Sequence, residues 1–420
     1  MRRRDTASSF LWREGRVLLL HRKESMRSYP GLWSVISGSV ERGETPLQTA
    51  RREIREETGY EGEALRPLAA AAPFEVFEEE RDTQWRVHSF LWLLHSSRPP
   101  CLNQENDAFR WQKDPRLPEL KTVPRLAEAL HSLLPRPIPR SLEGVERLRA
   151  DREHGAAQLA VQLLDEFEEI LPLLRDWPQL VVAATKFANA RPAMTPLASL
   201  SWRWLAGMGP LQLEQGSLPH AAPLRARERE TLRERVGELR SAYHEALTLS
   251  ALAGAHRLQA AQSAATFSYS STVAQAFRLA LKSGRGPRRV LLSRALPGGE
   301  GESFAQELGA WGYEVELLSD EELVRRIGEA EVLLLGADSL FPDGSFANKI
   351  GSARLAEAAK AQGVEVLVCA DSFKRAVSRE DFAAETIDDG SGQSPLFEIV
   401  ASSLVDAVLD EFTPDADRAI

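Results

Sequence analysis

The sequence predicts an α/β protein in which a helical region separates two regions of mixed strands and helices. Three observations lead to this prediction. Short apolar strand-like runs bounded by turn residues fill the first third of the chain. Residues 141–262 are rich in Leu, Ala, Glu and Arg at helical spacing, and strands alternate with helices from Ala265 onward. The last pattern is typical of a doubly wound parallel sheet.

Length and composition set limits on the function. A chain of 420 residues is expected to form two or three domains. Its formal net charge of −9 argues against a general nucleic-acid-binding protein, which needs a basic field. The two cysteines, Cys101 and Cys369, are far apart, so we expect neither a disulfide framework nor a zinc site, and a reducing cytoplasm fits.

Membrane insertion and secretion are not expected. No run of about 18 apolar residues is present, which argues against a transmembrane helix. Arg13, Glu14 and Arg16 interrupt the apolar stretch near the start of the sequence, so we do not expect a signal peptide.

The first region has the elements of a sheet covered by helices. A turn at Glu14-Gly15 is expected to join two strands in a hairpin. A further strand is expected to lead directly to Gly38, and a closing helix is expected with Thr122 as its N-cap. The expected strands are 7–12, 16–21, 34–37 and 85–94, and the closing helix is 123–134.

One helix is predicted from its own capping residues. Thr45 is a good N-cap, Pro46 suits the first helical position, and Gln48 completes a capping box. Gly59 is free to adopt the left-handed conformation that ends a helix. The helix should therefore run from Thr45 to about Thr58.

This helix carries a group of acidic residues. At helical spacing Glu53, Glu56 and Glu57 share one face, while the apolar residues share another. Such crowding of carboxylates is unfavourable unless a cation lies among them, and hard oxygen ligands suit Mg²⁺ or Mn²⁺. The alternative is a solvated acidic face that is paired with the neighbouring arginines, Arg51, Arg52 and Arg55.

The segment from Gly38 to Tyr60 resembles the signature of the Nudix hydrolases. Tyr60 stands where an aliphatic residue is more usual. The resemblance implies an α/β/α sandwich that hydrolyses a nucleoside diphosphate linked to another group, with Mg²⁺ or Mn²⁺ as cofactor. The matching positions are Gly38, Glu44, Arg52, Glu53, Ile54, Glu56, Glu57 and Gly59.

The same resemblance implies a role for each matching residue. Glu53, Glu56 and Glu57 would bind the metal, and one of them could serve as base. Arg52 would orient the carboxylates, and Glu44 would hold Arg52 or a second metal. Gly38 and Gly59 would permit the backbone turns at either end.

Further residues are expected to complete the site. In related hydrolases a glutamate from the region of Glu105 often joins the metal or acts as base; the alternative is a surface loop acid. The base and sugar of the substrate would be recognised by loops outside the signature, for which 74–80, 85–88 and 96–110 are the candidates.

The best domain boundary is a proline-rich stretch. Pro135, Pro137 and Pro139 alternate with other residues, which makes the segment stiff and extended. We therefore predict a hydrolase domain, a linker, a helical subdomain of four to six helices and a C-terminal domain. Their ranges are 1–134, 135–140, 141–262 and 263–420.

The C-terminal domain is predicted to contain alternating strands and helices. In parallel sheets of this kind, ligands bind beyond the carboxyl ends of the strands. The expected strands are 288–293, 313–318, 331–336 and 364–370, and the expected helices are 271–283, 302–311, 320–328 and 350–362.

Two segments of this domain carry chemistry. Asp338 follows the strand 331–336, and Asn348-Lys349 are expected to open the next helix, where a lysine beside free amides makes a phosphate site. The hydroxyls of 266–272 could hold a second anion. The alternatives are a structural Asp338, which caps a turn, and a solvated surface Lys349.

Residues 141–410 resemble the family of translation initiation factor 2B alpha, beta and delta subunits, which includes methylthioribose-1-phosphate and ribose-1,5-bisphosphate isomerases. The stretch from Gly336 to Gly351 is the most specific, and Ala190-Arg191-Pro192 and His154-Gly155-Ala156 also match. The isomerases use an aspartate, which falls on Asp338, and a cysteine, which falls on Ser268. The resemblance implies phosphate binding by Arg191, Asn348 and Lys349.

Three departures argue against isomerase activity. A serine hydroxyl is far less acidic than a thiol, so Ser268 would exchange protons poorly with a sugar carbon. The arginine–glycine pair of the isomerases is His154-Gly155 here, and the loop after strand 288–293 lacks the usual arginine–proline pair.

Three functions are compatible with these patterns. The first is a hydrolase alone. The second is a bifunctional enzyme whose hydrolase releases a ribose phosphate that the C-terminal half isomerises. The third is a sensor in which the C-terminal half binds a sugar phosphate or nucleotide and regulates the hydrolase or a protein partner. The initiation-factor resemblance implies a homodimer through the C-terminal half.

Overall fold

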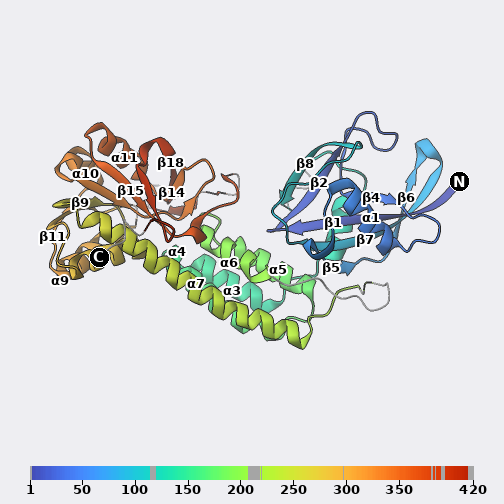
Figure 1. Cartoon of the computed structure of the whole chain (residues 1–420), viewed down its shortest axis with the longest axis horizontal. Helices are drawn as coiled ribbons and strands as arrows, with labels where there is room; N and C mark the ends of the chain where they lie inside the picture. The colour runs from blue at the N-terminus through green and yellow to red at the C-terminus, as the bar shows by residue number, and fades with distance from the viewer. Residues whose placement is uncertain are drawn as a thin grey trace. The chain divides into compact units, whose positions relative to one another are not determined.

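The computed structural model describes residues 2–113, 120–206, 218, 220–296, 298–379, 382–383, 385–388 and 393–414 (Figure 1). The chain forms two compact units. The first comprises residues 1–143, 168–186 and 202–233, and the second comprises 144–167, 187–201 and 234–420. The mixed α/β class predicted from the sequence is confirmed.

An eight-stranded sheet organises the N-terminal region. Its main path has the order β3-β2-β1-β7-β5, and β1 and β2 form the predicted hairpin. The long strands β1 and β7 run parallel at its centre. The strands are β1 (Arg2–Arg13), β2 (Arg16–Arg22), β3 (Trp33–Ser34), β4 (Ile36–Ser39), β5 (Leu65–Ala70), β6 (Phe74–Glu78), β7 (Thr83–Leu94) and β8 (Asn106–Lys113).

Helix α1 (Pro46–Thr58) packs on one face of this sheet (Figure 1). Both halves of the predicted capping box between Thr45 and Gln48 are present, and Gly59 ends the helix in the left-handed conformation with φ 70°. Ile54 is fully buried in the core beneath the helix. This packing fixes which face of α1 carries the acidic residues.

Two predicted elements of this region differ from the structure. The closing helix α2 (Leu126–Leu133) begins later than predicted, and its N-cap is Arg125 rather than Thr122. Thr122 instead pairs with Trp33 in an isolated bridge, which keeps the chain extended up to that point. The strand expected at 34–37 is divided between β3 and β4, so Gly38 lies inside β4.

The predicted helical region contains five α-helices in the part of the chain that the structure describes. The proline-rich segment lies between α2 and α3, and its last residues enter α3. Residues 189–194 separate α5 from α6, whereas 207–217 and 219 lie outside the described residues. The helices are α3 (Pro139–Ala150), α4 (Ala156–Ile170), α5 (Trp177–Ala188), α6 (Thr195–Leu205) and α7 (Ala226–Leu258).

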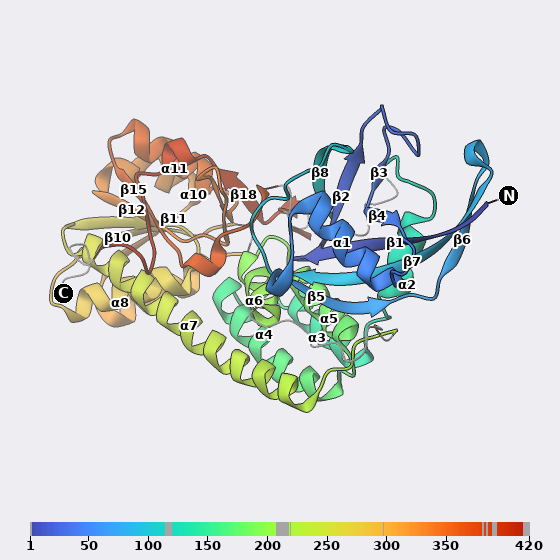
Figure 2. The ribbon, with the colours of Figure 1, turned by 45° about the vertical axis from the view of Figure 1, so that its right-hand side comes forward.

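The C-terminal region has the predicted doubly wound parallel sheet, in the order β11-β10-β9-β12-β15-β19. One apolar core joins α10 and α11 to one face, and a second joins α8 and α9 to the other (Figure 2). The strands are β9 (Ser263–Thr266), β10 (Arg289–Ser293), β11 (Glu314–Leu318), β12 (Val332–Leu335), β15 (Glu365–Cys369) and β19 (Ala407–Leu409). The helices are α8 (Ser271–Lys282), α9 (Glu300–Trp311), α10 (Asp320–Arg326) and α11 (Ser352–Ala361).

A small antiparallel sheet follows the strand that ends near Asp338. It consists of β13 (Ser339–Leu340), β14 (Phe346–Lys349) and β18 (Phe397–Val400). The prediction that Asn348 and Lys349 open a helix is wrong, because both end β14 and pair with β18. Helix α11 begins only at Ser352. A separate two-stranded sheet contains β16 (Thr386–Asp388) and β17 (Gln393–Pro395).

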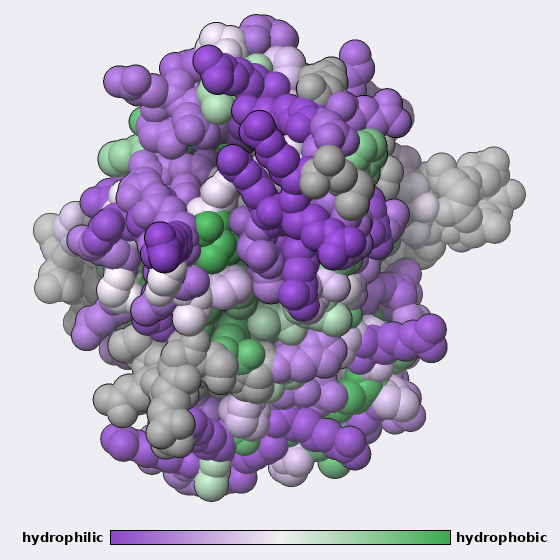
Figure 3. Space-filling view, turned by 90° about the vertical axis from the view of Figure 1, so that its right-hand side faces the viewer, coloured by the Kyte–Doolittle hydropathy of each residue, from purple (hydrophilic) through white to green (hydrophobic). Residues whose placement is uncertain are grey.

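Figure 3 shows a face of the molecule that is mainly hydrophilic, with small separate apolar areas. Within the described ranges, no helix combines the length and the apolar character that crossing a membrane requires.

Candidate functional site

The N-terminal site begins where β4 faces α1. Gly38 pairs with Ala7 of the central strand β1 and therefore has a fixed position. A Cβ atom at Gly38 would lie 1.8 Å from Oε1 of Glu53. Glycine at this position thus lets the Glu53 carboxylate lie directly against the strand.

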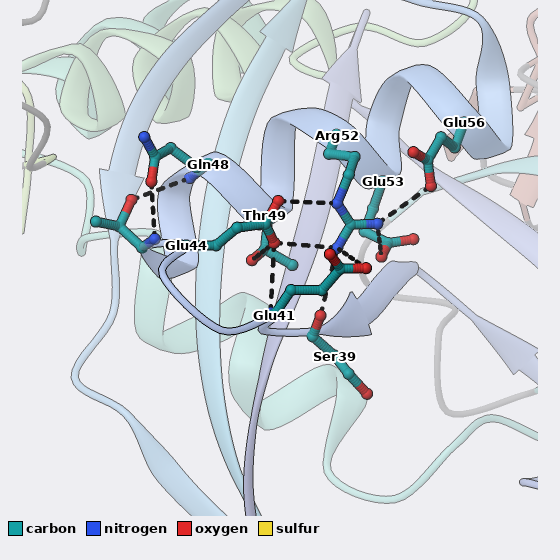
Figure 4. Close-up of polar contacts among 9 residues, drawn as sticks. Ser39, Glu41, Glu44, Gln48, Thr49, Arg52, Glu53 and Glu56 are labelled. Atoms are coloured by element: carbon teal, nitrogen blue, oxygen red, sulfur yellow. Dashed lines mark hydrogen bonds and ion pairs between the residues drawn. The ribbon is translucent and has the colours of Figure 1, made fainter.

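Arg52 lies among four carboxylates, of which Glu41 is the most distant at 3.9 Å (Figure 4). Its guanidinium binds Glu44 through two contacts, Nε to Oε1 at 3.1 Å and Nη2 to Oε2 at 3.2 Å. Its Nη1 donates to Glu53 at 2.7 Å and to Glu56 at 3.1 Å. Hydrogen bonds from Arg52 and Thr49 lower the pKa of Glu44 to about 2. Glu44 therefore holds Arg52, as predicted for one of its two roles.

Glu57 points away from Arg52 into the protein. It is 4% exposed, and its carboxylate accepts hydrogen bonds from the backbone N of Ser37 and from Nδ2 of Asn106, each at 3.0 Å. Burial, helped by the nearby charges of Glu53 and Glu105 and opposed by the hydrogen bonds from Ser37 and Asn106, raises the pKa of Glu57 to about 8. Burial also raises the pKa of Glu53.

These carboxylates are chemically suited to bind a cation, but in this structure they are not arranged around a metal position. Among the described residues, no group of three or more His, Cys, Asp or Glu side chains is arranged to hold a metal ion. Glu53 and Glu56 bind Arg52, while Glu57 faces Asn106. Glu105 nevertheless raises the pKa of both Glu53 and Glu57, so negative charge gathers here. Glu53, Glu56, Glu57 and Glu105 are the residues that could hold Mg²⁺ or Mn²⁺.

A cavity of about 630 Å³ adjoins these acids and includes Gly38, Glu53 and Glu105 in its lining. Alternation along paired strands builds much of its wall, because side chains two residues apart share one face of a sheet. Each segment proposed for substrate recognition contributes to the lining. The strand residues that alternate in this way are Thr6, Ser8 and Phe10 of β1, Phe74, Val76 and Glu78 of β6, and Trp85, Val87 and Ser89 of β7.

The raised pKa of Glu57 predicts a stability change with pH in the metal-free protein. Its ordinary pKa is 4.5 and the folded value is about 8, so the folded state binds the proton more tightly. The stabilisation is complete below about 4.5 and is lost as pH rises through about 8. Unfolding by urea in a chelator should show this loss, and Glu57→Gln should remove that part of the slope. An unchanged slope in the variant would contradict the assignment.

A second group of charges surrounds Asp338 in the C-terminal region. Burial, opposed by Lys374, Arg191 and Lys349 and helped by Glu385, raises the pKa of Asp338 to about 6. The loop that contains Arg191 is joined to Asp338 through a hydrogen bond from Thr195 N to Asp338 O at 3.2 Å. Sequence reasoning missed Lys374 and Glu385.

The other predicted residues of this region have defined places. Asn348 donates from Nδ2 to Oγ of Ser352 at 2.9 Å. Lys349 is not a solvated surface lysine, because it is buried and binds Glu300 at 2.8 Å. Ser268 is buried with a positive φ of 62°, which is uncommon for a serine. The predicted anion segment contributes to a cavity of about 410 Å³ lined by His154, Ser271 and Thr272, among others.

Two family models match the chain. Residues 2–133 match the NUDIX domain, so the acid cluster and its cavity lie in a domain of this class. Residues 152–390, more than half of the chain, match the initiation factor 2 subunit family (IF-2B). The chain therefore belongs to the initiation factor 2 subunit family and carries a NUDIX domain before it.

Curated relatives match the C-terminal part. Ribose 1,5-bisphosphate isomerase of Haloterrigena turkmenica is 27% identical over 38% of this chain and 56% of its own length. A putative translation initiation factor eIF-2B subunit 2-like protein of Pyrococcus horikoshii is 32% identical over 35% of this chain and 52% of its own. Methylthioribose-1-phosphate isomerase of Synechococcus is 33% identical over 26% of this chain and 38% of its own length. The chain thus spans about half the length of the first two.

Solved structures agree on the fold. Translation initiation factor eIF-2B of Pyrococcus horikoshii OT3 has a TM-score of 0.56 at 24% identity and covers 67% of this chain and 100% of its own. A tetrameric eIF2B beta and delta complex of C. thermophilum has a TM-score of 0.52 at 17% identity, covering 66% and 93%. At these identities the likeness concerns the fold alone.

Proposed function

We propose that the N-terminal domain is a hydrolase that depends on Mg²⁺ or Mn²⁺ and cleaves a nucleoside diphosphate linked to another group. The main support is the position of Glu53, which lies against Gly38 and lines the 630 Å³ cavity. The NUDIX match supports the reaction class. A cavity of this size suits a nucleotide-sized ligand.

In this proposal each residue of the site has a role. Glu53, Glu56 and Glu57 would hold the metal, which would neutralise phosphate charge and supply an activated water. Glu44 fixes Arg52, and Arg52 orients the carboxylates around it. Glu105 assists as a ligand or as the base. Water attacks one phosphorus, the bridging P–O bond breaks, and each product leaves with one phosphate.

The walls of the cavity supply groups for the rest of the substrate. Trp85 donates from Nε1 to Glu78 at 2.8 Å, which fixes its indole, and a fixed aromatic ring suits stacking against a base. Arg125 lies 4.5 Å from the ring centroid of Phe74 at the same cavity. These contacts support a nucleoside as the recognised part.

We further propose that the C-terminal half binds a sugar phosphate or a nucleotide, that the chain forms a homodimer through this half, and that it works in the cytoplasm. The cationic residues around Asp338 and the match to isomerase relatives support the ligand class. The proposed domain boundaries lie at residues 134, 140 and 262. Arg191, Asn348 and Lys349 are the proposed ligand contacts, and Asp338 is the proposed acid–base group.

Isomerisation of a ribose phosphate is the second candidate for this half. A pKa of about 6 suits Asp338 for proton exchange near neutral pH, which favours catalysis. Ser268 at the expected cysteine position argues against it, because its hydroxyl is a poor proton donor at this pH. Regulation by a bound ligand without turnover is the remaining alternative.

The decisive test is a substrate panel on the full chain. Nucleotide sugars, dinucleotides, ADP-ribose and nucleoside triphosphates should be incubated with Mg²⁺ or Mn²⁺ and with a chelator. We expect phosphate-containing products from at least one nucleoside diphosphate derivative only when metal is present. No product from any substrate would refute the hydrolase. Formation of a ketose from ribose 1,5-bisphosphate would favour isomerisation, and ligand-dependent thermal stabilisation without turnover would favour the sensor.

A further inference from the structure

Lys349 is already neutralised inside the protein. Its side chain is 6% exposed, and Nζ binds Oε1 of Glu300 at 2.8 Å. A lysine is almost never buried without a partner, because its charge loses hydration there. The Glu300 carboxylate therefore takes the place beside Lys349 that the anionic group of a ligand would otherwise take.

The other cations around Asp338 are also paired. Arg191 binds Glu385 at 2.6 Å, and Lys374 lies 4.0 Å from Asp371. Arg191 also donates to the backbone O of Asp151 at 2.6 Å. With a carboxylate at each cation, the site lacks the surplus positive charge that a phosphate needs. A phosphate can pair with one of these cations only by displacing the carboxylate that is bound to it.

The three carboxylates differ in how easily they can be replaced. The side chain of Glu385 is 14% exposed and that of Asp371 is fully buried, whereas that of Glu300 is 41% exposed. A side chain that is already partly exposed can turn into water without disturbing the packed interior, whereas a buried carboxylate cannot. Glu300 is therefore the one whose release costs least.

The local structure around Glu300 supports its release. Glu300 is the first residue of α9 and follows Gly298 and Gly299, both with positive φ. Glycines permit alternative backbone conformations at low steric cost. Oε2 of Glu300 is buried and accepts no hydrogen bond from the described residues. One carboxylate oxygen thus remains unsatisfied while the ion pair is closed, which weakens the closed state.

The amides at the start of α11 do not offer an alternative site. Gly351 N and Ala353 N both donate to Oε1 of Glu398, at 2.7 Å and 2.8 Å. Glu398 lies in β18, paired with Asn348 of β14, and its carboxylate is held by both amides at once, so these donors are already occupied. The exchangeable position is the one on Lys349.

We propose that Glu300 is a specificity-determining residue that occupies the anion position on Lys349, and that a phosphate-bearing ligand must displace it to bind. The proposal rests on the sugar-phosphate or nucleotide ligand assigned above to the C-terminal half. It implies weak binding of simple phosphates by the natural protein and selection for ligands whose remaining groups offset the displacement.

The test compares Glu300→Gln with the natural protein. The full chain is titrated by calorimetry with inorganic phosphate and with ribose 5-phosphate. Removing the competing charge should strengthen binding of both about tenfold or more, which is about 1.4 kcal/mol. Glu302→Gln is the matched control, because Glu302 lies in the same turn of α9 but pairs with the exposed Arg294. It should leave binding unchanged, and Lys349→Met should abolish the gain.

Each other outcome would overturn the inference. Equal binding by Glu300→Gln and the natural protein would show that Glu300 does not compete, while leaving the proposed ligand class intact. Equal gains in Glu300→Gln and Glu302→Gln would reveal a general charge effect. Absence of binding in every variant would refute both the inference and the proposed ligand class. Hydrolysis by the N-terminal domain, measured on the same samples, reports separately on that activity.

Discussion

Replacing Glu57 by glutamine is expected to lower metal-dependent hydrolysis on the order of 10² to 10³-fold, the usual cost of losing one group that stabilises transition-state charge. A neutral amide cannot supply the anionic oxygen that Mg²⁺ prefers. The loss should appear in kcat/KM at saturating metal, with a higher metal concentration needed for half-maximal activity.

The variant should still fold, which separates catalysis from stability. Because burial holds the pKa of Glu57 near 8, the metal-free protein at neutral pH carries this group mainly protonated, and an amide has nearly the same shape. Oδ1 of Asn106 accepts no hydrogen bond from the described residues, so rotating that amide by 180° would satisfy the new NH₂ group. In a chelator the variant should match the natural protein in urea below about pH 4.5 and be the more stable of the two at neutral pH, where the natural protein has lost stabilisation because Glu57 ionises on unfolding.

Glu63→Gln provides the matched control, because Glu63 is exposed in a short 3₁₀ helix outside the site. It should retain full activity. Unchanged turnover in Glu57→Gln, or turnover that persists in a chelator, would contradict the assignment of Glu57 as a metal ligand.

The predictable parts of the structure are those fixed by near neighbours in sequence. Helix α1 is the clearest case, since Thr45, Gln48 and Gly59 determine both of its ends through contacts within a few residues. The alternation of strands and helices in the C-terminal region can be predicted from the sequence in the same way. Each strand there is a short buried apolar run, which periodicity detects without knowledge of its partners.

The parts that sequence did not predict depend on distant partners. Nothing near Glu57 indicates that Asn106, 49 residues away, faces it. The helix expected at Asn348-Lys349 failed for the same reason: pairing with β18, about fifty residues later, keeps this segment extended. A local signal cannot report such pairing, because strand formation depends on the neighbour it meets.

The charges around Asp338 show the same limit. Lys374 and Glu385 come from segments without a recognisable motif, and only the tertiary structure brings them to Asp338. Nothing in the sequence near Glu300 indicates its ion pair with Lys349, which spans 49 residues. The motif predicts a polar site here but carries no information about its state of charge.

Gly38→Ala should separate the position of Glu53 from the stability of the fold. The added Cβ would lie 1.8 Å from Oε1, 2.0 Å from Cδ and 2.6 Å from Cγ of Glu53, so either the backbone at residue 38 or the Glu53 side chain must move. Gly38 is held by its pairing with Ala7, whereas the Glu53 side chain can turn at χ1. The Glu53 carboxylate should therefore move away from Arg52, at a stability cost on the order of 1 kcal/mol.

A displaced Glu53 should reduce metal-dependent turnover about 10²-fold, since a shift of about 1 Å at a catalytic group typically costs that much. Gly309→Ala makes the same chemical change in α9, where no atom lies within 4 Å of the added Cβ. It should keep full activity and stabilise the helix by up to about 1 kcal/mol. If Gly38→Ala retained turnover, Glu53 would not need its place against β4. A loss of turnover with little loss of stability would show that Gly38 is needed for the position of the Glu53 carboxylate and not for the stability of the sheet.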